Sequence, residues 1–252
     1  SDFAAVQPLL EPVLASYPDD IDALNLTSNA LLQEGKTSEA IELLSRVAQL
    51  QPDSAEAKVR LGAGLLMDGK GDDALQPIQS ALEMNPNIPM ADMLLVLNYM
   101  KKKDYPAAIA AAEDYQKRNP DVVAPLNLLG RVYQESGKVD EARKAFQRAL
   151  ALDSADQGAN SYLAQLALAD NDLVTARNHY RTILAANPNS HQALIQLASL
   201  DAREGQEKAM VDHLETAMAV APTALAPRVL LARYYLAKDK PAQVPPLFAT
   251  LD

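Results

Sequence analysis

The sequence predicts an all-α protein built from repeated antiparallel helical hairpins. The first observation is a column of prolines spaced by 34 residues, with Ser154 at the one skipped step: Pro18, Pro52, Pro86, Pro120, Pro188 and Pro222. The second is a column at the same period in which glycine, asparagine or aspartate predominates: Gly35, Gly69, Lys103, Gly137, Asn171, Gly205 and Asp239. The third is the helical spacing of apolar residues between these columns. A period without insertions indicates one continuous repeat array.

Each repeat is expected to consist of two helices that meet at the glycine column. In the fourth repeat, Leu126, Leu129 and Tyr133 recur at the spacing of one helix face. Gly137 follows, and glycine readily adopts the left-handed backbone that ends a helix. The second helix places the small Ala142 where the two helices meet. The pattern therefore predicts a close-packed hairpin.

The register divides the chain into a leading half-repeat and seven repeats, which together form a single solenoid over residues 1–252. The half-repeat, residues 1–20, has the pattern of a second helix. The repeats are expected at 21–54, 55–88, 89–122, 123–156, 157–190, 191–224 and 225–252, the last being truncated. Because terminal repeats normally need a polar cap, exposed ends predict a monomer or an end-stacked dimer caused by truncation.

Three residues depart from the pattern and predict local irregularity. Met210 replaces the small residue of the second helix, so the hairpin of residues 191–224 is expected to be splayed. Lys103 stands in the glycine column, where a side chain strains a left-handed backbone. Pro77 lies inside a second helix and is expected to kink it.

Composition and charge exclude several classes of protein. The 252 residues carry 23 Lys+Arg against 33 Asp+Glu, for a net charge of −10, which disfavours nucleic acid because phosphate contacts need a basic face. No apolar run is long enough to span a bilayer. There is no cysteine, and so no disulfide, thiolate metal site or cysteine nucleophile. No catalytic constellation or cofactor motif is present, and we expect neither an enzyme nor a cofactor.

Two of the three histidines lie at a spacing that could suggest a metal site. His179 and His213 lie one period apart, on equivalent positions of neighbouring second helices. A step of roughly 8–10 Å between helices is too long for a shared ion without inward-reaching side chains. With no third ligand in the same columns, we expect structural or surface histidines and no metal site.

The repeat resembles the tetratricopeptide repeat over the whole chain. The consensus residues of that family are best matched in the fourth repeat, by Leu126, Leu129, Gly130, Tyr133, Gly137, Ala142, Phe146 and Ala149. The resemblance implies a right-handed superhelical α-solenoid. It also implies a concave groove, lined by the first helix of each hairpin, that binds a peptide segment or a partner protein.

The resemblance implies that the groove is lined by the second, fifth, sixth, ninth, twelfth and thirteenth residues of each repeat. Carried over to this sequence, these columns give two groups of candidate residues. The apolar group is Met67, Met90, Met93 and Leu97, with Val59 and Met100 in the same columns. The polar group is Asn127, Arg131, Gln165, Gln196, Arg203 and Arg233. Methionines suit adaptable apolar contacts. The alternatives are that the apolar residues belong to the core and that the polar face is merely solvated.

The two groups suggest how a partner segment binds. Its apolar side chains are expected on the second and third repeats, and its acidic or carboxyl end near Arg131 and Arg203. Removing both arginines is expected to weaken binding, because charge-assisted hydrogen bonds contribute about 1.5–3 kcal/mol each.

Phrases within the later repeats also resemble the TPR-repeat lipoproteins of the PEP-CTERM/exosortase system. They are residues 126–130, 142–146, 176–180 and 227–233. This resemblance implies a lipid-anchored protein on the periplasmic side of the bacterial envelope, active in export or exopolysaccharide assembly. The lipid-bearing cysteine and leader would precede Ser1. The alternative is a cytosolic adaptor or co-chaperone that binds peptide tails.

Overall fold

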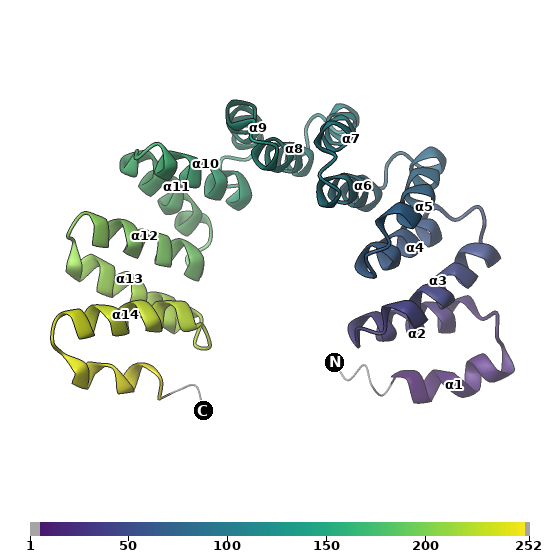
Figure 1. Cartoon of the computed structure of the whole chain (residues 1–252), viewed down its shortest axis with the longest axis horizontal. Helices are drawn as coiled ribbons and strands as arrows, with labels where there is room; N and C mark the ends of the chain where they lie inside the picture. Colours follow the sequence, from purple (N-terminus) through teal and green to yellow (C-terminus); the bar gives the residue numbers. More distant parts are fainter. Residues whose placement is uncertain (1–5, 250–252) are drawn as a thin grey trace. The chain divides into compact units, whose positions relative to one another are not determined.

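The computed structural model describes residues 6–249, within which there are α-helices and short 3₁₀ helices and no strand (Figure 1). The predicted all-α fold is confirmed. The first five residues of the expected half-repeat and the last three of the expected final repeat lie outside the described residues. The helices are α1 (Val6–Ser16), α2 (Ile21–Gln33), α3 (Thr37–Leu50), α4 (Ala55–Met67), α5 (Gly71–Met84), α6 (Pro89–Lys101), α7 (Tyr105–Arg118), α8 (Val123–Glu135), α9 (Val139–Leu152), α10 (Gln157–Ala169), α11 (Leu173–Ala186), α12 (His191–Arg203), α13 (Glu207–Val220), α14 (Leu225–Ala237), η2 (Pro241–Gln243) and η3 (Pro245–Leu247).

The helices belong to two compact bodies. Residues up to Pro120, with Arg131–Lys138, form the N-terminal body. Asp121–Gly130, with the residues from Val139 onward, form the C-terminal body. Within each body, helices that follow one another in the chain pack side by side. The even-numbered helices from α2 to α14 begin 34 residues apart. We call these the first helices and the odd-numbered ones the second helices.

Side-chain caps explain where several first helices begin. Asp20, Ser54, Asp156 and Ser190 immediately precede α2, α4, α10 and α12. Each side-chain oxygen accepts a hydrogen bond from the backbone N–H three residues later. A cap of this kind satisfies one of the four N–H groups that a helix leaves unpaired at its start.

The turn between the two helices of a hairpin has the left-handed backbone that the glycine column predicts. Gly35 has a φ of +77° and Gly137 a φ of +79°. The three substitutes in this column keep the conformation, since Lys103, Asn171 and Asp239 have φ values of +58°, +57° and +56°. The expected strain at Lys103 is thus confirmed as a positive φ on a residue with a side chain.

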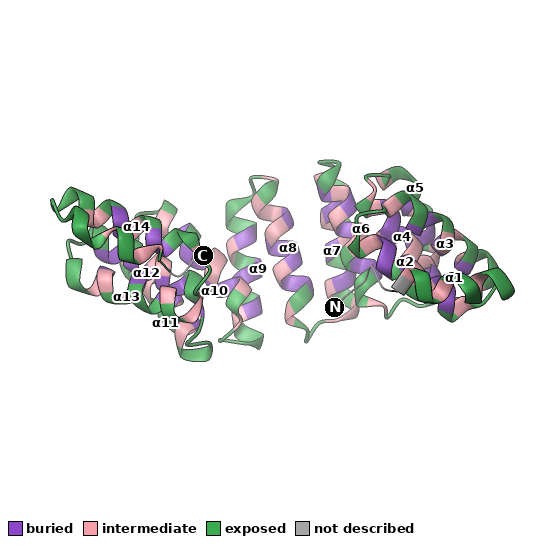
Figure 2. Ribbon diagram, turned by 90° about the horizontal axis from the view of Figure 1, so that it is seen from below, coloured by how far each residue is buried: buried purple, intermediate pink, exposed green. Residues whose placement is uncertain are grey.

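Small residues at the crossing of the two helices allow close packing in both bodies. Ala40, Ala74 and Ala176 have no exposed surface, and Figure 2 shows the buried residues along the faces that neighbouring helices share. The splaying expected from Met210 is wrong. Met210 is buried against Ala198, and α12 packs on α13 as extensively as α4 packs on α5. The flexible thioether chain fills the crossing without separating the helices.

Proline and the last repeat give two further local features. Helix α5 runs unbroken from Gly71 to Met84 with Pro77 buried inside it. After α14, the described chain forms η2 and η3 and no further α-helix. The buried Arg228 of α14 donates hydrogen bonds to the carbonyls of Leu247 and Pro222, which holds this segment against α14.

Within residues 6–249, every helix is too short or too polar to cross a lipid bilayer.

Candidate functional site

The C-terminal body contains a hollow of about 410 Å³ between the first helices α10 and α12, with α11 beneath it. We call it the glutamine hollow. Its polar lining consists of Gln157, Ser161, Gln165, Ser190, Gln192 and Gln196, together with Tyr162 and Tyr180. Ile183 and Ala193 complete the wall. Of these residues, Ser161, Tyr162, Gln165, Gln192 and Gln196 stand in the columns that the sequence assigns to the groove.

The local sequence explains why the hollow forms here. Gly158 stands at the second position of its repeat, where a side chain would narrow the opening. A Cβ atom built on Gly158 would lie 3.2 Å from the Asn127 side-chain nitrogen. Tyr162 stacks on the buried Phe146 ring of the preceding hairpin, with ring centroids 4.7 Å apart. This stacking fixes the wall of the hollow from behind.

The chemistry of the hollow is neutral and rich in hydrogen-bonding groups. Side-chain amides offer both donors and acceptors, and hydroxyl groups offer one of each. Burial raises the pKa of the Tyr180 hydroxyl, so that this group stays protonated. None of the residues that line the hollow carries a charge at neutral pH. Such a lining matches the peptide backbone, whose N–H and C=O groups require a partner when they leave water.

The polar candidates are distributed over the two bodies. Gln165 and Gln196 line the glutamine hollow together, on facing helices. Arg203 lies at the end of α12, where its guanidinium donates to the Asn171 side-chain oxygen at 3.3 Å. Arg233 is an exposed residue of α14. Arg131 belongs to the N-terminal body, so its joint role with Arg203 stays a prediction.

Asn127 adjoins the hollow without lining it. Its amide nitrogen donates to the Asp156 carboxylate at 2.8 Å, and the same carboxylate oxygen caps α10. Its side-chain oxygen is buried and has no hydrogen-bond partner among the described residues. The donor that the sequence assigned to a ligand is therefore already used to connect two repeats.

The apolar candidates lie in the N-terminal body and divide into surface and core. Met90 and Met93 of α6 are 50% and 39% exposed, and Leu97 continues their stripe as a half-buried residue. Met67 is the last residue of α4 and is 59% exposed. Val59 and Met100 are buried, so their assignment to the groove is wrong. Side chains at these two positions turn into the helix interface.

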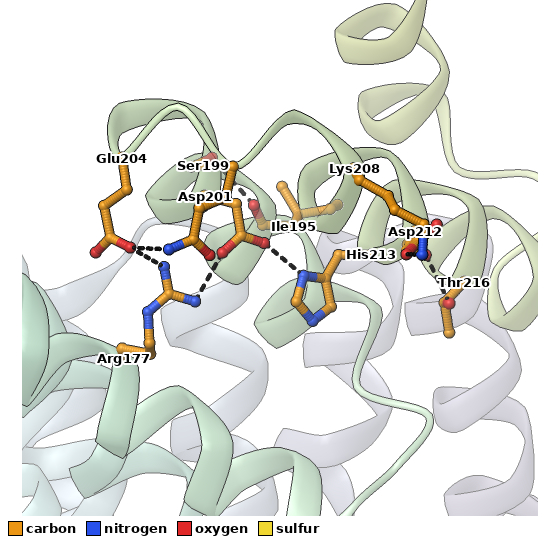
Figure 3. Close-up of polar contacts among 10 residues, drawn as sticks. Arg177, Ile195, Ser199, Asp201, Glu204, Lys208, Asp212, His213 and Thr216 are labelled. Atoms are coloured by element: carbon orange, nitrogen blue, oxygen red, sulfur yellow. Dashed lines mark hydrogen bonds and ion pairs between the residues drawn. The ribbon is translucent and has the colours of Figure 1, made fainter.

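A buried polar network connects the first helix α12 with the second helices α11 and α13. Asp201 of α12 has no exposed surface, and its two oxygens accept from Arg177 of α11 and His213 of α13, each at 2.7 Å (Figure 3). The second nitrogen of the Arg177 guanidinium donates to Glu204 at 3.0 Å. No motif in the sequence marks these positions, because the three partners come from two different repeats.

A series of polar contacts links five of the second helices, α3, α5, α9, α11 and α13, to the turn of the next repeat. We call this series the turn ladder. Its members are Thr37–Asp68, Asp72–Lys102, Arg143–Asp170, Arg177–Glu204 and Glu207–Lys238. The later partner always occupies the same position of its repeat, immediately before the left-handed residue. These contacts join neighbouring hairpins at equivalent places.

The two histidines expected in structural roles each bond to a buried side chain of a first helix. His213 bonds to Asp201, as described above, and the Nδ1 of His179 lies 2.9 Å from the Asn160 side-chain oxygen. The Asn160 nitrogen donates to the carbonyls of Ser154 and Asp156. The Asn160 oxygen is therefore the acceptor, and Nδ1 carries the proton of the neutral His179 ring.

Replacing His179 with glutamine is expected to reduce the loss of stability in mild acid. Burial lowers the pKa of His179 from its ordinary value of 6.5, so the unfolded chain binds a proton more readily than the folded one. Stability at this residue is therefore present above about pH 6.5 and declines as the pH falls below it. Urea unfolding at about pH 7.5 and pH 5 measures the difference. His191→Gln, at an exposed position, is the control, and an unchanged pH dependence in His179→Gln would contradict the assignment.

Family models match the chain in both bodies. Two models described as tetratricopeptide repeat match residues 127–199 and, in overlapping segments, 1–61 and 31–97. The curated relatives include tetratricopeptide repeat protein 1 of Schizosaccharomyces pombe, 26% identical over 48% of this chain and 12% of the relative. They also include the tetratricopeptide repeat protein 21 homolog of Caenorhabditis elegans, 30% identical over 38% of this chain and 7% of the relative. These matches span only a small part of either relative.

Solved structures share the fold. One chain in the crystal structure of the APC/C hetero-tetramer Cut9–Hcn1 is similar to this chain, with a TM-score of 0.60 and 19% identity. The similarity covers 100% of this chain and 50% of that chain. PilF of Pseudomonas aeruginosa has a TM-score of 0.62 and 18% identity over 84% of this chain and 97% of its own. A crystal structure of MamA has a TM-score of 0.55 and 27% identity over 61% of this chain and 84% of its own.

The helical bounds, the left-handed turn column and these matches agree. The tetratricopeptide repeat is in general a non-catalytic scaffold for contacts between proteins, which agrees with a hollow lined by uncharged hydrogen-bonding groups. The chain belongs to the tetratricopeptide repeat family.

Proposed function

We propose that the chain is a protein–protein interaction scaffold that binds an extended peptide segment in the glutamine hollow. The carrying observation is that Gln165 and Gln196 face one uncharged hollow from two successive first helices. Two amides from successive helices can each bond to the peptide backbone, because each amide is both donor and acceptor. A neutral lining with these groups favours backbone recognition over recognition of a charged side chain.

The volume of the hollow limits what enters it. About 410 Å³ holds a short stretch of backbone and a side chain, and not a folded domain. The floor contributes one apolar contact at Ile183 and the Tyr180 hydroxyl. A segment with a small or medium side chain between two exposed peptide groups therefore fits the hollow.

A peptide selection tests this proposal directly. A phage-displayed library of random twelve-residue peptides is selected on the wild-type chain, and the enriched peptides are measured by fluorescence anisotropy. Gln165→Ala/Gln196→Ala is expected to weaken them about tenfold, since each hydrogen bond contributes about 0.5–1.5 kcal/mol. Gln49→Ala/Gln147→Ala, on exposed residues of second helices, is the matched control. Enriched peptides that bind the hollow variant as tightly as the wild type would refute the proposal.

The cellular setting that we propose is the bacterial envelope, in the periplasm or anchored to the outer membrane on its periplasmic side. There the scaffold would hold components of an export or exopolysaccharide assembly system. The support is the resemblance of residues 126–130, 142–146, 176–180 and 227–233 to the TPR-repeat lipoproteins of the PEP-CTERM/exosortase system. Fractionation of source cells with an antibody against the chain tests this setting. Recovery in the cytosol would support the alternative of a cytosolic adaptor for peptide tails.

A further inference from the structure

The N-terminal body contains a second hollow, of about 600 Å³, between α1, α2 and α3. We call it the acidic hollow. It lies between two second helices, whereas the glutamine hollow lies between two first helices, so the two use opposite sides of the repeat. Its apolar wall consists of Leu14, Leu31 and Leu43, one from each helix. Neither the family resemblance nor the groove positions predict a site on this side.

The depth of the acidic hollow follows from one residue. Thr27 occupies a column that is leucine in every later repeat, from Leu61 to Leu231. Threonine is shorter than leucine, so the side chain that fills this place elsewhere is missing here. The Thr27 hydroxyl is buried and has no hydrogen-bond partner within the described part of the chain. A buried hydroxyl normally has a partner, and this one is left unsatisfied at the wall of the hollow.

The rim of the acidic hollow is strongly negative. Glu11, Glu39 and Glu42 line it, and no side chain that lines it is basic. None of the three carboxylates belongs to an ion pair among residues 6–249. The three carboxylates favour binding of a cation at the rim of the acidic hollow, and the apolar wall favours binding of an apolar side chain inside it.

The equivalent place in the C-terminal body, between α11, α12 and α13, shows how a cation is accommodated there. There Arg177, Asp201 and His213 form the buried network of Figure 3. The corresponding residues 170 positions earlier are Gln7, Leu31 and Leu43, none of which is charged. The chain therefore supplies its own arginine at one of these places, and at the other it offers carboxylates and an apolar wall.

From this contrast we infer that the acidic hollow docks a partner segment that inserts one apolar side chain and flanks it with lysine or arginine. The apolar side chain lies against Leu14, Leu31 and Leu43, and the flanking cations lie at the glutamate rim. This surface is independent of peptide binding in the glutamine hollow.

Three synthetic peptides of twelve residues test the inference by fluorescence anisotropy. The first peptide consists of alternating Leu-Leu and Lys-Lys pairs. The second has glutamate at every lysine position of the first, and the third has serine at every leucine position. Only the leucine–lysine peptide is expected to bind the wild-type chain. Thr27→Leu fills the hollow with the residue of the other repeats and is expected to weaken this peptide at least about tenfold. Thr27→Ser keeps the hollow open and is expected to retain binding.

Charge is tested separately, because a chain of net charge −10 attracts any basic peptide. Glu39→Gln/Glu42→Gln is expected to weaken the leucine–lysine peptide several-fold and to reduce the salt dependence of its binding. Glu83→Gln/Glu215→Gln removes the same charge from exposed positions elsewhere and is expected to change the affinity by less than about twofold.

Several results would overturn the inference. They are equal binding by the wild type and Thr27→Leu, equal loss in the two glutamate pairs, and no binding of the leucine–lysine peptide to the wild type. Circular dichroism melting confirms that each variant is folded. Gln165→Ala/Gln196→Ala is expected to leave this binding unchanged, so failure here and failure of the glutamine hollow are distinguishable.

Discussion

Replacing Asp201 with alanine is expected to lower the free energy of unfolding by about 3 kcal/mol or more. Asp201 has no exposed surface, and the Arg177 side chain that it binds is only 12% exposed. Removing the carboxylate leaves a nearly buried guanidinium with Glu204 as its remaining partner, and breaking a buried pair in this way typically costs about 3–5 kcal/mol. Urea denaturation followed by circular dichroism measures the change.

Two further variants separate the free-energy cost of breaking the buried ion pair from the cost of any substitution of aspartate. Asp170→Ala removes the partner of Arg143 at an exposed place in the turn ladder, and it is expected to cost less than about 1 kcal/mol. Asp201→Asn keeps the size of the side chain and removes its charge. A loss in Asp201→Ala no greater than that in Asp170→Ala would show that the network contributes little.

Replacing Phe146 with alanine is expected to cost about 3–5 kcal/mol, the usual range for a large aromatic residue in a core. Phe146 is fully buried, packs on Gly130 of its own hairpin and stacks on Tyr162 of the next repeat. Its removal therefore weakens two interfaces. Because Tyr162 lines the glutamine hollow, peptide binding is expected to weaken as well.

Phe146→Leu provides the comparison for this variant. Leucine keeps most of the apolar volume but cannot stack on Tyr162, so its cost is expected to fall well below that of alanine. Repeat proteins can unfold in parts, so unfolding is measured with two probes. Equal stability of Phe146→Ala and the wild type would contradict the packing described here.

The periodic features of the fold could be predicted from the sequence, and the contacts between distant residues could not. The glycine column fixes the left-handed turns, and Lys103 takes that conformation because the repeat imposes it. Met210 shows the limit of column reasoning, since a flexible side chain fills a place that alanine fills elsewhere. The column correctly placed Met210 where α12 and α13 meet, but the splaying expected from its larger side chain does not occur.

The candidate site divides in the same way. Gln165 and Gln196 were predicted, and the column rule also applies to Gln192 at the second position of its repeat. Tyr180 lines the hollow from a second helix, outside the groove columns, so no groove rule could find it. The pairing of Arg177 with Asp201 depends on packing between repeats, which a single repeat does not reveal.

The turn ladder has a consequence for how such a chain can change in length. Arg177 meets Glu204 in the next repeat, but Lys238 stands at the same position one repeat later. Loss of residues 191–224 by recombination would bring two cations together, whereas loss of residues 157–190 would bring Arg143 to Glu204, a pair of opposite charge. Since each surface pair contributes only about 0–1 kcal/mol, the ladder favours one order of repeats over another without forbidding either. The repeats therefore share one backbone structure but are not interchangeable. The charges in the turn ladder of each repeat are complementary to those of the repeat that now follows it.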